Sequence, residues 1–242
     1  MIDPDDITSW LLLGTLGLAL GVGLILLGWK LAMLRRQRLE SKPVLPLQTF
    51  FPGPAPSLLR PAGWLAIRSA SPESVRATLG LNRAEPCSWA EGLAGGHEFF
   101  ISPRVHGWVI VTGVGLPNPT DDVDAVFLFL TALSRKLGHV QYFYANRRSQ
   151  HHGWARLDDG CVTRAYAWTG ETVWSQGIET LPEIEVNVKL FGYGDDSATP
   201  AEAAANCHKV AQLAARWSLD PAEVKLASVR QSIGLAGESA FI

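Results

Sequence analysis

The densest group of chemically capable residues lies between residues 145 and 161, in "ANRRSQHHGWARLDDGC". His151 and His152 are possible metal ligands or catalytic bases, and Asp158 and Asp159 are possible partners for them. Cys161 follows directly and adds a potential nucleophile. A catalytic or metal site would require these five side chains to converge on one point.

The local pattern favours a β-hairpin over an active site. The segments "YFYANRR" and "HGWARLDD" are strand-like, and "RSQHH" lies between them. Because neighbouring side chains of a strand point to opposite faces, His151 and His152 cannot readily share one metal. The run Asp158-Asp159-Gly160 predicts the next turn. We therefore interpret the stretch as the decorated end of a hairpin, with an enzyme built on the same residues as the alternative.

The remaining histidines and cysteines add no chemistry to this picture. His139 follows a helix-ending glycine, and none of the histidines has partners at the spacing of a zinc site. Cys87, Cys161 and Cys207 are odd in number and widely spaced, which indicates a reducing compartment; Cys161 is expected to be a core thiol. The sequence thus assigns no catalytic residue, no cofactor, no metal and no small-molecule substrate.

An uncharged segment of twenty residues, "WLLLGTLGLALGVGLILLGW" at 10–29, predicts a transmembrane helix. As a helix it spans about 30 Å, the thickness of the hydrocarbon core, and we assign the helix to residues 10–34. The acidic start, residues 1–9, is unlike a signal peptide. Basic residues after the span predict an outside N-terminus and a cytoplasmic body in a bacterial inner membrane. The predicted interface anchors are Trp10, Trp29, Lys30, Arg35, Arg36 and Arg38.

Small residues along this helix predict a packing interface. Gly14, Gly17, Gly21 and Gly28 fall on one stripe, and Gly17-x-x-x-Gly21 is the spacing that lets two helices approach closely. The expected partners are other transmembrane subunits within the lipid bilayer. Residues 43–242 carry a net charge of −3, which argues against nucleic acid as a partner.

Residues 35–62 form a basic and then proline-rich linker, which favours extended chain. Its apolar side chains, Phe50 and Phe51 among them, predict a strap that lies on the domain, the headgroups or a neighbouring subunit. The aromatic residues of the domain favour a sheet core, and the alternative is an aromatic contact surface on the strand face that carries Tyr142 and Tyr144.

A cytoplasmic domain is predicted over residues 63–227, followed by a C-terminal tail at 228–242. Strand patterns joined by turn residues alternate with helices at 72–79, 120–137 and 200–217, each with capping residues at its start. Such a pattern predicts an α+β fold, a mostly antiparallel sheet with a few helices that cover one face, preceded by the transmembrane helix.

The runs "HGWVIVTGVGLP", "LSRKLGHVQYF", "HGWARLDDGCVTRAYAWTGETVW" and "AARWSLDP" resemble a group of uncharacterised bacterial proteins over about residues 97–222. The resemblance implies a compact domain and carries over no catalytic residues. In layout alone, the chain is similar to the H subunit of photosynthetic reaction centres.

These features together predict a non-enzymatic, single-pass accessory or structural subunit that docks on and stabilises a larger bacterial membrane complex, of photosynthetic or respiratory type. Two alternatives stay open. One is a membrane-tethered enzyme of unknown reaction, and the other is a self-associating signalling or immunity protein.

Overall fold

A computed structural model describes residues 61–68, 71–195, 197–224 and 233–239 of the 242-residue chain. The predicted transmembrane helix, its glycine stripe, its basic flank and the strap with Phe50 and Phe51 lie outside these residues. Among the helices that the structure describes, none combines the length and apolarity that crossing a bilayer requires. The described residues belong to the domain that begins near Gly63.

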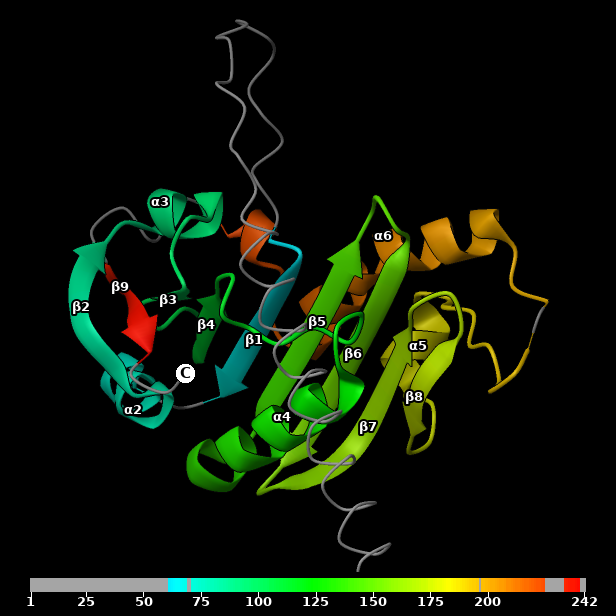
Figure 1. Ribbon diagram of the computed structural model, residues 1–242, viewed down its shortest axis with the longest axis horizontal. Helices are drawn as coiled ribbons and strands as arrows, with labels where there is room; N and C mark the ends of the chain where they lie inside the picture. Colours follow the sequence, from blue (N-terminus) through cyan, green and yellow to red (C-terminus); the bar gives the residue numbers. More distant parts are fainter. Residues whose placement is uncertain (1–60, 69–70, 196, 225–232, 240–242) are drawn as a thin grey trace, which may run out of the picture. The chain divides into compact units, whose positions relative to one another are not determined.

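A nine-stranded sheet forms the centre of this domain, and every pairing between its described strands is antiparallel (Figure 1). The strand order is β2-β9-β3-β4-β1-β5-β6-β7-β8. The strands are β1 (Gly63–Arg68), β2 (Leu81–Cys87), β3 (Phe99–Ile101), β4 (Trp108–Thr112), β5 (Val140–Asn146), β6 (His151–Asp158), β7 (Cys161–Trp168), β8 (Thr172–Gln176) and β9 (Gly234–Ser239). The predicted α+β class with a mostly antiparallel sheet is confirmed.

Helices cover both faces of the sheet, whereas the sequence led us to expect one covered face. The helices are α2 (Pro72–Leu79), α3 (Trp89–Ala94), α4 (Val123–Leu137), α5 (Leu181–Glu185), α6 (Pro200–Trp217) and the 3₁₀ turn η1 (Pro221–Glu223). One core cluster joins the sheet to α2 and α4, and the other joins it to α3 and α6.

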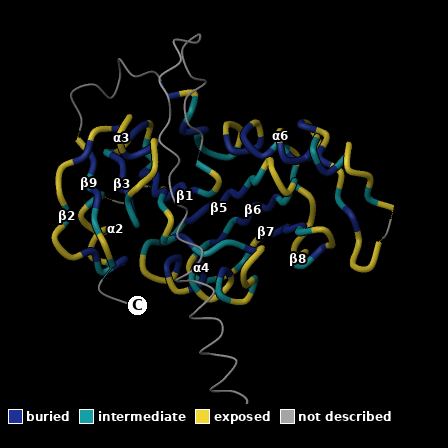
Figure 2. The backbone as a smooth tube through the Cα atoms, turned by 45° about the horizontal axis from the view of Figure 1, so that its top comes forward, coloured by how far each residue is buried: buried dark blue, intermediate teal, exposed yellow. Residues whose placement is uncertain are grey.

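The central strand β1 explains why both faces need cover. Trp64 and Ala66 point into one core cluster, while Leu65 and Ile67 point into the other, and all four are fully buried. A strand that is apolar at every position must be covered on both sides. Figure 2 shows the result, with buried strands in dark blue between helices and turns that carry the exposed residues.

Capping residues set the boundaries of α2 and α6 where the sequence predicted them, whereas α4 begins at Val123, three residues after its predicted start. The Ser71 side chain accepts a hydrogen bond from the Ser74 backbone at the start of α2, and Gly80 ends that helix in the left-handed conformation, with φ 64°. Asp122 caps α4, and Thr199 with Glu202 forms the capping box of α6.

Two strands and two short helices were not predicted from the sequence. Strand β2 reads "LNRAEPC", which is polar and contains proline, as an edge strand can. Helices α3 and α5 are five or six residues long, too short for a periodic pattern. Strand β9 comes from the segment that we predicted as a tail, and it pairs with both β2 and β3 inside the sheet.

Candidate functional site

The stretch with His151, His152, Asp158 and Asp159 belongs to a β-hairpin. Strands β5 and β6 pair from Val140↔Leu157 to Asn146↔His151, and Gln150 in the connecting turn has a positive φ of 62°. This pairing confirms the hairpin interpretation. It also places the side chains of His151 and His152 on opposite faces of the sheet.

The two adjacent histidines do different things. The Nδ1 atom of His151 lies 3.1 Å from the Thr120 hydroxyl, at the entrance to α4. His152 is fully buried on the other face, where its ring stacks with those of Trp154 and Trp168. Burial lowers the pKa of His152 to about 4, so its ring is neutral at physiological pH. His152 is therefore a member of the aromatic core.

The aspartates and Cys161 lie at the far end of β6. Asp159 and Gly160 form a tight turn with φ values of 49° and 83°, and Asp158 is paired with Cys161 across it. The eight residues of β6 separate this turn from the histidines by about 23 Å at the usual rise per residue. The five residues of the predicted cluster thus do not form one site.

The prediction that Cys161 is a core thiol is wrong, because its side chain is exposed. The first three residues of β7 are exposed or partly exposed, and its continuous burial starts only at Arg164. The apolar character of the segment belongs to the later part of the strand.

Asp158 has a partner that the sequence did not suggest. Its carboxylate is hydrogen-bonded to Nδ1 of His139, which we had treated as isolated behind the end of α4. The other ring nitrogen of His139 lies 2.9 Å from the Gln141 amide, which also donates to the carbonyl of Trp217. Since both ring nitrogens are engaged, this pair fastens the turn after α4 to the end of α6.

Tyr142 and Tyr144 do not form an exposed contact surface. Both side chains are buried in the core cluster that contains α4, and the Tyr142 hydroxyl donates to the carbonyl of Pro117 at 3.0 Å. Burial raises the pKa of Tyr142 well above its ordinary value. The alternative of a contact surface is wrong because α4 and the loop before it cover this side of β5, and the favoured interpretation of an aromatic core agrees with this burial.

Exposed apolar side chains gather instead at α5. Ile178, Leu181 and Ile184 are 89%, 67% and 58% exposed, and they occur within seven residues of one another. Leu181 and Ile184 are three apart in a helix and share its face. We call these three residues the α5 patch.

A buried ion pair holds α5 in place. The Glu183 carboxylate accepts from Nε of Arg164 at 2.8 and 3.0 Å, and from the indole nitrogen of Trp154 at 2.7 Å. It also accepts from the backbone and hydroxyl of Thr180, which caps the helix. Glu183 and Arg164 are both buried, so α5 is tied to β6 and β7 by bonds shielded from water.

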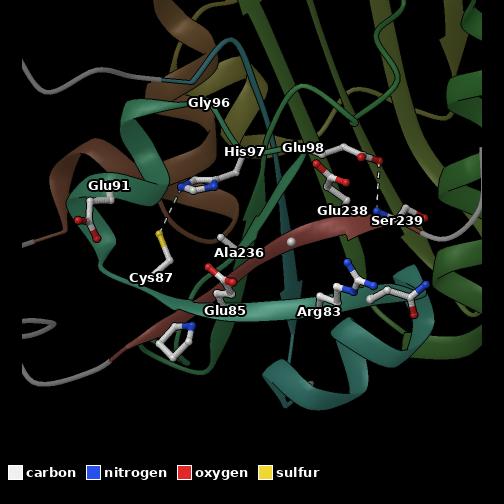
Figure 3. Close-up of a pocket in the computed structure, with 13 residues that line it drawn as sticks. Arg83, Glu85, Cys87, Glu91, Gly96, His97, Glu98, Ala236, Glu238 and Ser239 are labelled. Carbon is white, nitrogen blue, oxygen red and sulfur yellow. Dashed lines mark hydrogen bonds between the residues drawn. The ribbon is translucent and has the colours of Figure 1, made fainter.

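The described part of the chain also contains an open cavity of about 790 Å³ beside β2 and β9 (Figure 3). Figure 3 shows Cys87 and His97 pointing toward each other on its wall, with Sγ 3.6 Å from Nε2. Four carboxylates and one guanidinium also line it, those of Glu85, Glu91, Glu98, Glu238 and Arg83.

The electrostatics of the cavity keep Cys87 protonated at rest. Burial raises the pKa of the Cys87 thiol, and the nearby Glu91 carboxylate raises it further. The pKa of Glu91 is itself lowered by hydrogen bonds from the side chain and backbone of Ser88. Nowhere among the described residues do three histidine, cysteine or carboxylate side chains meet in a group able to hold a metal ion.

Sequence reasoning missed the contact between Cys87 and His97, although one pattern bears on it. Ser88-x-x-Glu91 is a capping box and predicts a helix start directly after Cys87. That helix returns the chain toward the end of β2, and His97 follows it.

The chain matches no protein-family model, no curated protein and no solved structure. The resemblance over residues 97–222 stays a prediction. Function has to be inferred from the geometry of this chain itself.

Proposed function

We propose that the chain is a non-enzymatic, single-pass subunit whose cytoplasmic domain docks on a larger bacterial membrane complex and stabilises it. The observation that carries the proposal is the α5 patch, in which Leu181 and Ile184 are exposed on a short, anchored helix and Ile178 is exposed just before it. A photosynthetic or respiratory assembly is the class of complex that the predicted layout favours.

The free energy available from the patch is substantial. Burying a leucine or isoleucine side chain that was exposed contributes about 1.5–3 kcal/mol. The ion pair of Glu183 with Arg164 already fixes the helix that carries Leu181 and Ile184. Little conformational entropy is therefore lost on binding, which is the condition under which a small apolar surface is most effective.

The charges around the patch favour a protein partner over the lipid surface. Glu179 and Glu185 lie beside the apolar residues and are exposed, and Glu185 is partly neutralised by its pair with Arg216. The cytoplasmic leaflet is negatively charged, so it attracts basic segments and repels acidic ones. Membrane proteins, by contrast, carry an excess of lysine and arginine in their cytoplasmic loops, and such loops complement an acidic rim.

The test replaces the patch in the full-length protein within its native membranes. The variant Ile178→Ser/Leu181→Ser/Ile184→Ser is compared with Val114→Ser, which removes a somewhat smaller aliphatic side chain that is 81% exposed in a different loop. After mild solubilisation and affinity purification, we expect the triple variant to lose its co-purifying membrane proteins by about tenfold or more. The Val114 variant should retain them.

Thermal unfolding followed by tryptophan fluorescence verifies that both variants are folded. Since the replaced side chains are exposed, their removal should leave stability nearly unchanged. A folded triple variant that still purifies with the full set of partners would overturn the docking role of α5.

A further inference from the structure

The cavity beside β2 and β9 places a thiol and an imidazole in contact, far along the sheet from the α5 patch. Cys87 ends β2, His97 precedes β3, and Sγ and Nε2 lie 3.6 Å apart. Cys87 is buried, with 5% of its surface exposed, and it is one of the residues that line the open cavity. A nucleophile beside a base, facing a space large enough for a small molecule, is the arrangement of an activated thiol.

We propose that Cys87 is a reactive thiol that exchanges with small cationic disulfides bound in this cavity, with His97 as its base. The cysteine side chain would thereby carry a reversible covalent modification.

The exchange balances without a further reagent. His97 Nε2 accepts the proton of the Cys87 thiol, and the sulfur attacks one sulfur of the disulfide R–S–S–R. The new bond joins Cys87 Sγ to that sulfur, the old S–S bond breaks, and the electron pair leaves with R–S⁻. The imidazolium returns its proton to R–S⁻, so Cys87 is oxidised and one R–SH is formed.

The base matters because the resting thiol is protonated. Burial and the Glu91 carboxylate raise the pKa of Cys87, so little thiolate is present at neutral pH without help. His97 is only half-buried and can exchange its proton with solvent between reactions.

The wall of the cavity selects the charge of the disulfide. Glu85, Glu91, Glu98 and Glu238 provide four carboxylates against the single guanidinium of Arg83. A cavity lined by one sign of charge concentrates ligands of the opposite sign and excludes those of the same sign. A dicationic disulfide is therefore favoured over a dianionic one of the same length.

The full-length protein in mild detergent is incubated with cystamine, a dication, or with dithiodipropionate, a dianion of similar length. Peptide mass mapping then follows the modification of each cysteine with time. We expect Cys87 to react with cystamine about tenfold faster or more than with the dianion. Cys161 is exposed outside the cavity and serves as the internal control, with a smaller preference.

Two variants test the role of His97 as base separately from the role of the cavity's carboxylates in charge selection. His97→Gln should slow modification of Cys87 about tenfold or more while its preference for cystamine persists. Glu85→Gln/Glu238→Gln should reduce the preference while His97 still supports reaction. Circular dichroism and the continued protection of the buried Cys207 verify that each variant is folded.

Three results would each overturn the proposal. They are a Cys87 that stays unmodified in the folded wild-type protein, equal rates with the two disulfides, and a folded His97→Gln variant that reacts at the wild-type rate. The first two need no variant.

Discussion

At the residue scale, the histidines show how one residue type is used in three ways. His152 is a neutral ring stacked in the core, His139 joins Asp158 to Gln141, and His97 faces a thiol across an open cavity. The first of these has a direct consequence for stability, since an imidazole that is buried neutral must be protonated in acid.

His152 should make the domain less stable in mild acid. Its pKa is lowered from 6.5 to about 4 by burial, so between these values the unfolded chain binds more protons than the folded one. The free energy of unfolding therefore falls as the pH drops from 6.5 to 4, and the loss from this group is about 3 kcal/mol. Above pH 6.5 the contribution is complete.

The measurement compares urea unfolding of the wild-type protein and His152→Phe at pH 7 and pH 4.5, followed by tryptophan fluorescence. The variant should lose less stability between the two pH values, whatever its stability at pH 7. His208→Gln removes an exposed histidine on α6 and should keep the wild-type profile. An identical pH dependence in His152→Phe would contradict this account.

Sequence reasoning succeeded for neighbouring residues and failed for distant ones. Because successive side chains of a strand point to opposite faces, the sequence alone predicted that His151 and His152 lie on opposite faces of the sheet. The pairing of His139 with Asp158 depends on the register of β5 against β6, which brings Val140 opposite Leu157. No local pattern reveals that register, so the contact could not be predicted.

At the element scale, the same contrast separates capped helices from short or polar elements. Helices α2, α4 and α6 have capping residues that the sequence displays. Strand β9 contains glycines because its neighbours approach closely; a Cβ at Gly234 would lie 2.5 Å from the carbonyl oxygen of Ile101. Glycine weakens a strand pattern, and this explains why β9 was assigned to a tail.

Helix α5 depends on one buried carboxylate, which gives a sharp test at this scale. Glu183→Ala leaves the Arg164 guanidinium buried without a counterion, and we expect a loss of about 3–5 kcal/mol in the free energy of unfolding. Glu185→Ala, on the same helix, removes an exposed pair with Arg216 and should cost at most about 1 kcal/mol.

Chemical unfolding of the two variants under identical conditions measures this difference. The Glu183 variant should also show faster hydrogen exchange in α5, because the helix loses its bonds to β6 and β7. Equal stabilities of the two variants would show that the buried pair does not anchor the helix.

At the scale of the whole molecule, the proposed function combines a predicted membrane helix with an α+β domain that the structure describes. The antiparallel sheet followed from alternating strands and turns, but its second covered face did not, since only packing reveals which strands are buried on both sides. The site residues were the least predictable part. The α5 patch and the Cys87–His97 pair are surface features that only the assembled sheet displays.

The central claim is that this chain is a membrane subunit that docks on a larger complex. Native gel electrophoresis of mildly solubilised membranes, with mass spectrometry of the band that contains the chain, tests it most directly. The account predicts that the chain sediments with the membranes and co-migrates with several integral membrane proteins. Recovery of the chain in the soluble fraction, or its migration alone or as a small homo-oligomer, would contradict it.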